Sequence, residues 1–156
     1  MPRWRLFRSR VALAGEAGTA SLEFVTAGMI LLLPMVYLVL TMAAIQGASF
    51  AVEGAARQAV RVYVQAADIR DAEAQASRAL EFALADYGVD PSVATLTIEC
   101  SPRPADCLHR RGSVTISVAV SVPLPLMPGA LGARGPLAVP LLSSATEQVS
   151  RFWGAR

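Results

Sequence analysis

The stretch EAGTASLEFVTAGMILLLPMVYLVL, residues 16–40, decides the fold of this chain. After Gly18 it holds one charged side chain, Glu23, and no further Asp, Glu, Lys or Arg occurs until Glu53. As a helix, residues 24–45 would extend about 33 Å, enough to cross the hydrocarbon of a bilayer. A cleaved secretory signal has a shorter apolar core and a small-residue exit site, and no clean A-x-A follows this run. The sequence therefore predicts one transmembrane helix.

The charges before the span predict its orientation. Arg3, Arg5, Arg8 and Arg10 stand against the single Glu16, and an excess of Arg beside a span keeps that end in the cytoplasm. We therefore expect a single-pass protein of the cytoplasmic membrane with an extracytoplasmic C-terminal part. Beyond the span ten Arg balance ten acidic residues, so no basic stripe points to a nucleic-acid partner.

Helical periodicity continues beyond the span and predicts an amphipathic stalk. Glu53 and Arg57 stand there in the favourable i, i+4 order. Asp68 or Asp71 can cap a second helix that Gly88 ends. The expected apolar stripe of the stalk is Val52, Ala56, Ala59, Val60, Tyr63, Val64 and Ala67, and that of the second helix is Ala72, Ala76, Ala79, Leu80, Ala83, Leu84 and Tyr87. The pattern leaves open whether the two form one bent helix.

The period changes from 3.6 to 2 after Ser92, which predicts strands over 94–100 and 113–122. The intervening segment suits a long-looped antiparallel hairpin that packs on the second helix. Residues 123–136 are rich in Pro and Gly and predict a loop. Residues 137–152 favour a third strand, although 143–152 also fits a short helix.

The expected fold is an α+β membrane protein. A basic leader covers residues 1–18, and a transmembrane helix with its stalk covers 19–67. An extracytoplasmic helix and a small antiparallel sheet of about three strands cover 68–156.

Cys100 and Cys107 predict a disulfide, because the C-terminal part faces an oxidising compartment. Their spacing with His109 falls short of a zinc set, and no C-x-x-C is present. His109 is the only histidine, no G-x-S-x-G occurs, and LHRRG, residues 108–112, resembles a solvated turn. We expect no enzyme, no metal, no cofactor and no small-molecule substrate.

Glu23 allows two interpretations. It can mark the start of the span among lipid headgroups, where an ionised side chain costs little. Alternatively, a cut after Gly18 would create an α-amino group on Thr19 and make Glu23 the fifth residue of the product.

The segment G-TASLEF, Gly18 to Phe24, resembles the processing motif of prepilins and pseudopilins, in which a Gly and four residues precede Glu-Phe at the head of an apolar helix. The layout of the chain is similar to the TadE-like minor pilins (pseudopilins) of tight-adherence, or Flp, pilus systems. That resemblance implies removal of residues 1–18 by a prepilin peptidase. It also implies that Glu23 neutralises the N-terminal amine of a neighbouring subunit, so that the two charges enter the helix bundle as a pair.

The resemblance thus implies three kinds of partner: the membrane with its peptidase, other pilin subunits, and an inner-membrane assembly platform. The chain departs from the family's major subunits, which begin the mature chain with an aromatic residue or Met, where this one would begin with Thr19. An uncleaved anchored protein whose outer part binds another envelope protein or a ligand is the alternative. The apolar loop around Leu124, Leu126, Met127 and Leu131 either contacts a partner or folds back on the sheet.

Overall fold

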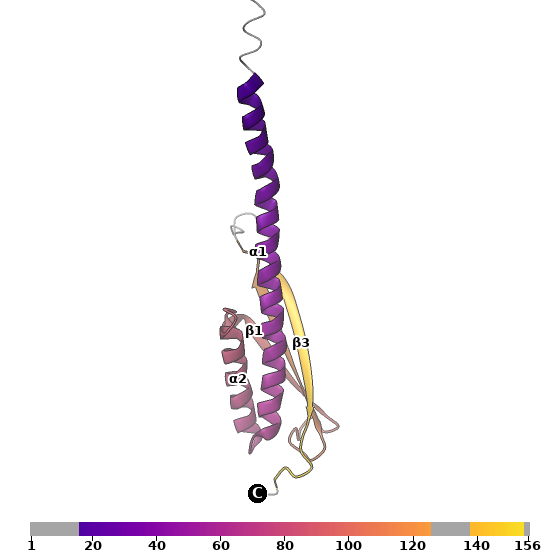
Figure 1. The fold of residues 1–156 in the computed structure, drawn as a ribbon. Helices are drawn as coiled ribbons and strands as arrows, with labels where there is room; N and C mark the ends of the chain where they lie inside the picture. Colours follow the sequence, from indigo (N-terminus) through magenta and orange to yellow (C-terminus); the bar gives the residue numbers. More distant parts are fainter. Residues whose placement is uncertain (1–15, 126–137, 155–156) are drawn as a thin grey trace, which may run out of the picture. The chain divides into compact units, whose positions relative to one another are not determined.

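The computed structural model describes residues 16–125 and 138–154. In this part of the chain a long apolar helix and a second helix are followed by a three-stranded antiparallel sheet, which confirms the α+β class (Figure 1). The elements in chain order are α1 (Glu16–Gln65), α2 (Ile69–Ala85), the 3-10 helix η1 (Pro91–Val93), β1 (Ala94–Ser101), β2 (Ser113–Pro123) and β3 (Ala138–Gln148). The chain divides into two compact units, unit 1 (residues 1–40) and unit 2 (residues 41–156).

Unit 1 contains the first part of α1, and the apolar side chains of this part are exposed. Phe24, Ile30 and Leu31 are exposed by 80%, 69% and 74%. Among the described residues, α1 is the helix long and apolar enough to cross a membrane. The Thr26 hydroxyl donates to the Leu22 carbonyl at 2.7 Å, so this polar group needs no water inside lipid. The helix also continues through Pro34, which transmembrane helices tolerate.

In unit 2 the later part of α1 becomes a core helix. The solvent side keeps the predicted polar stripe, where Arg57 donates to Glu53. Ala67, predicted on the apolar stripe, is exposed because α1 ends at Gln65. The buried side consists of Ala48, Ala51, Val52, Ala55, Ala56, Ala59, Val60 and Tyr63, and Ala66 directly after the helix is buried too; each is no more than 3% exposed. This segment therefore forms one wall of the core of unit 2.

Helix α2 is separate from α1, because the backbone leaves helical geometry at residues 66–68. The Asp68 carboxylate caps α2 by accepting the backbone N–H of Asp71 at 2.8 Å. Tyr87, predicted on the apolar face, is 56% exposed. The helix ends at Ala85 and the chain then turns through Gly88 at φ +68°, so Tyr87 has left the helical face. The buried residues of α2 are Ala72, Ala76, Leu80 and Leu84.

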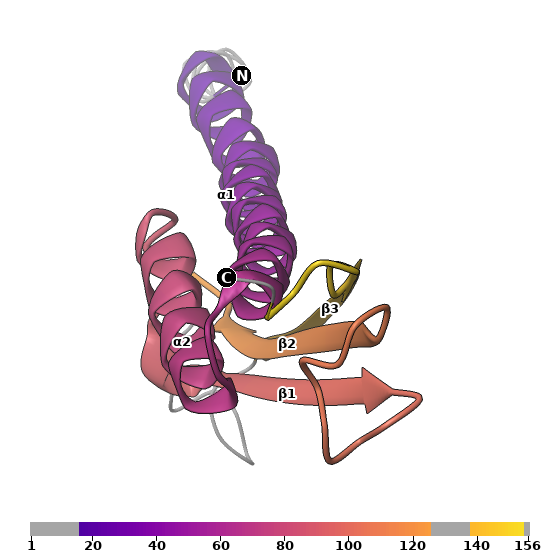
Figure 2. The ribbon, with the colours of Figure 1, turned by 90° about the horizontal axis from the view of Figure 1, so that it is seen from below.

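The sheet has the order β1-β2-β3, and both pairings are antiparallel. The predicted hairpin is confirmed, with Cys100 opposite Val114 at the end next to the connecting loop. The third element is a strand and not a helix, paired from Ser113↔Gln148 to Pro123↔Ala138. Both helices cover one face of the sheet, with α2 over β1 and α1 over β2 and β3 (Figure 2). The hairpin was expected to pack on α2, and the structure adds α1 as the other half of that cover. The buried strand residues are Val114, Ile116, Val118 and Val120 of β2.

The connection between β1 and β2 is anchored and does not behave as a fully solvated turn. Leu108 is 1% exposed and belongs to the core, which corrects the interpretation of LHRRG. The amide of Arg111 donates to the carbonyl of Val149, and the amide of Val149 donates to the carbonyl of Gly112 at 2.8 Å. Of the apolar loop, Leu124 is half-buried, whereas Leu126, Met127 and Leu131 lie outside the described residues.

Candidate processing and docking site

The predicted processing residues lie in the first turns of α1. Gly18, Thr19, Glu23 and Phe24 are all helical, and residues 1–15 of the predicted leader lie outside the described residues. Thr19 and Glu23 are four residues apart, which places them one above the other on the same helix face. A new α-amino group on Thr19 would be the backbone nitrogen at the free end of the helix, about one turn before Glu23.

The helical state of Gly18 matters for hydrolysis of the Gly18–Thr19 bond. A peptidase takes its scissile segment in extended form, so this turn would have to unwind before any cleavage. Glycine in a helix costs about 1 kcal/mol relative to alanine, and it presents no Cβ to a narrow active site. Gly18 thus weakens the helix at the bond that would have to open.

Glu23 is isolated on a bare apolar surface. It is exposed, and its side chain makes no hydrogen bond or ion pair within the part of the chain that the structure describes. Leu22 and Phe24 beside it are exposed by 70% and 80%. A carboxylate in such surroundings is costly in lipid unless a cation joins it. The arrangement suits pairing with an amine supplied after folding.

The predicted disulfide is the second site that the structure brings together. Cys100 and Cys107 are bonded, with 5.1 Å between their Cα atoms. The bond joins the end of β1 to the loop that carries Leu108. It therefore holds that loop against the core.

Trp153 is a structural residue that the sequence analysis missed. Its indole Nε1 donates to the carbonyl of Ala66 at 3.0 Å, and its own carbonyl accepts Arg110 Nε at 2.9 Å. The C-terminal turn is thereby joined to the α1–α2 turn and to the disulfide loop. The only sign of this role in the sequence was a tryptophan, next to Phe152, close to the C-terminus.

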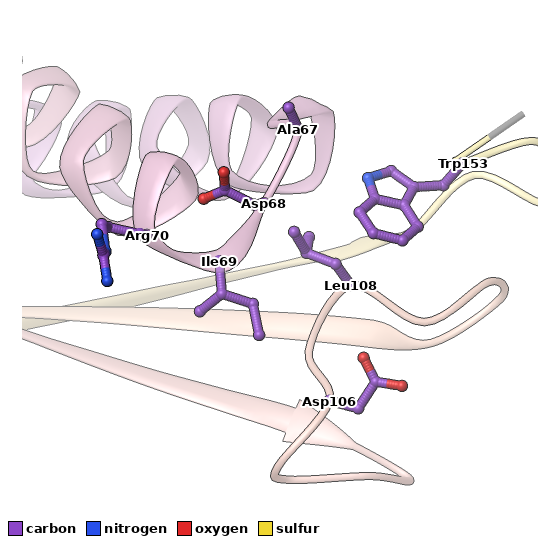
Figure 3. A pocket seen from close by; sticks show the side chains of 7 residues that line it. All are labelled: Ala67, Asp68, Ile69, Arg70, Asp106, Leu108 and Trp153. Carbon is purple, nitrogen blue, oxygen red and sulfur yellow. The ribbon is translucent and has the colours of Figure 1, made fainter. Parts of the chain in front are cut away.

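A surface pocket of about 500 Å³ lies where these three segments meet (Figure 3). Two of its polar groups already interact within the chain, because Asp68 caps α2 and Asp106 lies 4.0 Å from Arg103. Among the described residues no group of three or more metal-ligating side chains occurs. The pocket is lined by Ala67, Asp68, Ile69, Arg70, Asp106, Leu108 and Trp153.

Tyr63, near the end of α1, lies close to the first turns of α2. Burial raises the pKa of the Tyr63 hydroxyl, and the negative charge of Glu73 raises that pKa further. Glu73 of α2 therefore lies close to Tyr63 of α1. At the far end of α2, the backbone amide of Ser92 donates to Asp90 at 2.9 Å and lowers the pKa of that carboxyl.

No protein-family model, curated protein or solved structure significantly matches this chain. The assignment of function therefore depends on the geometry of the chain itself.

Proposed function

We propose that this chain is a minor pilin or pseudopilin, a structural subunit that takes part in assembly of a Tad/Flp-type pilus or a related secretion filament. The proposal rests on Glu23, which is the one charged residue between Gly18 and Glu53. Its side chain is exposed on an apolar helix and has no partner among the described residues. The later part of the same helix is built into the core of unit 2.

In this proposal a prepilin peptidase cuts after Gly18 and frees the amine of Thr19. A neighbouring subunit then presents its amine to Glu23, and the two opposite charges enter the helix bundle together. The apolar side chains of residues 22–42 supply the contact area, while Ala27, Gly28 and Ala43 allow close helix approach. The protein is a single-pass protein of the cytoplasmic membrane with its N-terminus in the cytoplasm, as the four leading arginines favour. Its partners are other pilin subunits and the inner-membrane assembly platform.

An uncleaved anchor is the second candidate, and one observation favours it. Helix α1 begins at Glu16 and passes through Gly18 and Thr19 without a break, so the bond to be cut is not exposed in an extended segment. Such a protein would use unit 2 to bind another envelope protein or a ligand.

The Glu23→Ala variant separates insertion from docking. We expect normal membrane insertion, because the apolar run is unchanged, and a large loss of co-isolation with partner subunits. Glu99→Ala is the matched control, since Glu99 is an exposed carboxylate of β1 on the face of the sheet that the helices leave uncovered. Equal co-isolation of wild type and Glu23→Ala would contradict the docking role.

A further inference from the structure

A groove runs along unit 2 between α1 and the edge strand β3. One hollow of about 190 Å³ lies between Ser49–Glu53 and Leu141–Ser143, and a second of about 480 Å³ lies between Gly54–Arg61 and Ser144–Glu147. The two adjoin, because their linings meet at consecutive residues on both elements. The twelve steps along the helix from Ser49 to Arg61 and the six along the strand from Leu141 to Glu147 each extend about 18–20 Å. The groove is therefore long enough for three turns of another helix.

The groove changes character along its length. Towards Ser49 its lining includes Val52, Leu141 and Leu142, and Leu142 is 75% exposed. Towards Gln58 it carries Arg57, Arg61 and Glu147. Gly54 lies midway, and a Cβ added there would meet no atom within 4 Å. The groove is therefore open. At one end Leu141 and the exposed Leu142 stand beside Ser49, Glu53 and Ser143, and at the other end the lining carries Arg57, Arg61 and Glu147.

The solvent face of α2 changes in the same direction. Phe82, near the C-terminal end of α2, is 73% exposed, whereas the earlier turns present Glu73, Ser77 and Arg78 to solvent. Because α2 folds back after a three-residue turn, Phe82 lies near the level of Val52. The proximity of Glu73 to Tyr63 agrees with that alignment.

We propose that the groove between α1 and β3 receives helix α2 of a second copy of this chain in the same orientation. This rests on the proposed function, because subunits anchored in one membrane share one orientation. Without any shift along the helix axis, Phe82 of one copy then meets Leu141 and Leu142 of the groove. Glu73 lies level with Arg61, and Arg78 lies level with the turn that carries the Glu53–Arg57 ion pair.

The contact is heterologous and can repeat. Figures 1 and 2 show α2 and β3 on opposite sides of the later part of α1. Each copy thus offers α2 on one side and the groove on the other, so that it binds one neighbour on each side. Such contacts generate rows or helical filaments and not closed pairs.

Cysteine cross-linking in membranes tests this contact in the full chain. Cys100 and Cys107 are bonded to each other, so Gly54→Cys and Arg78→Cys introduce the reactive thiols. With a short bismaleimide, the chain carrying both changes should give a ladder of dimers, trimers and larger species. A mixture of the two single variants should stop at dimers, and each single variant alone should remain monomeric.

The control pair is Thr97→Cys with Arg78→Cys, because Thr97 is exposed on the uncovered face of the sheet. We expect roughly tenfold less cross-linking from it, as only random encounters within the membrane remain. No ladder from the groove pair, or equal yields from both pairs, would overturn the proposal. The N-terminal mass of the same samples keeps the two questions apart. A ladder on uncleaved chains supports the groove contact while the filament role fails, and cleaved chains without a ladder reject the groove contact alone.

Discussion

Gly112 ends the connection between β1 and β2, residues 102–112, and packs closely against a side chain of that connection. A Cβ at this position would overlap the His109 ring, lying 2.7 Å from its Nδ1. That ring is held in place, because Nδ1 lies 2.7 Å from the carbonyl oxygen of Asp106. Glycine is therefore required here by the approach of a neighbouring side chain.

The Gly112→Ala variant should be destabilised by about 1–3 kcal/mol, the usual cost of overpacking. Thermal unfolding in detergent measures the change. Gly54→Ala is the matched control, since its new methyl group enters open space on an exposed part of α1. It should gain about 0.5–1 kcal/mol from helix propensity. A Gly112→Ala protein as stable as wild type would contradict the described packing of His109.

The sequence predicted the roles of some individual residues and not of others. Glu23 was evident because it is the only charge in a long apolar run. Leu108 and Trp153 were not evident. Leu108 is buried in a core built from several elements, and Trp153 donates to Ala66, which lies 87 residues earlier. No local pattern reports such contacts.

Elements with one buried face were predicted well. Strand β2 alternates strictly because its inner side chains are buried under both helices, and a shift of one residue would expose all of them. Strand β3 was ambiguous because it lies at the sheet edge, where Ser143 and Glu147 occupy positions of the covered face. Weak burial left a weak pattern there. Tyr87 was misplaced because the helical period was extended past the end of α2.

The disulfide supports one element, the loop between β1 and β2. The Cys100→Ser/Cys107→Ser variant should lose about 2.5 kcal/mol, the chain-entropy value for a closed loop of eight residues. Loss of protection from hydrogen exchange at the Arg111 and Val149 amides should accompany the loss of stability, because both amides are bonded between the loop and the C-terminal segment.

A reducing agent provides the control for this prediction. It should lower the stability of wild type by a similar amount and leave the double variant unchanged. Wild type that is indifferent to the reductant would show that the bond does not hold the loop.

At the scale of the whole molecule, the sequence predicted the order of helix and sheet and the boundary of the apolar run. It did not predict that the predicted stalk forms a core wall for unit 2, because amphipathicity identifies a buried face but not the surface that covers it. The partner of Glu23 could not be predicted from within the chain, since the proposed partner belongs to another subunit.

The central claim is that Gly18 and Glu23 form a cleavage and docking device. Mass spectrometry of the N-terminus, on protein from native membranes of cells with an active prepilin peptidase, tests it most directly. We predict a chain that begins at Thr19, and the intact leader in the same cells after the peptidase is inactivated. A chain that still begins at Met1 or Pro2, while the peptidase processes its other substrates normally, would contradict the claim.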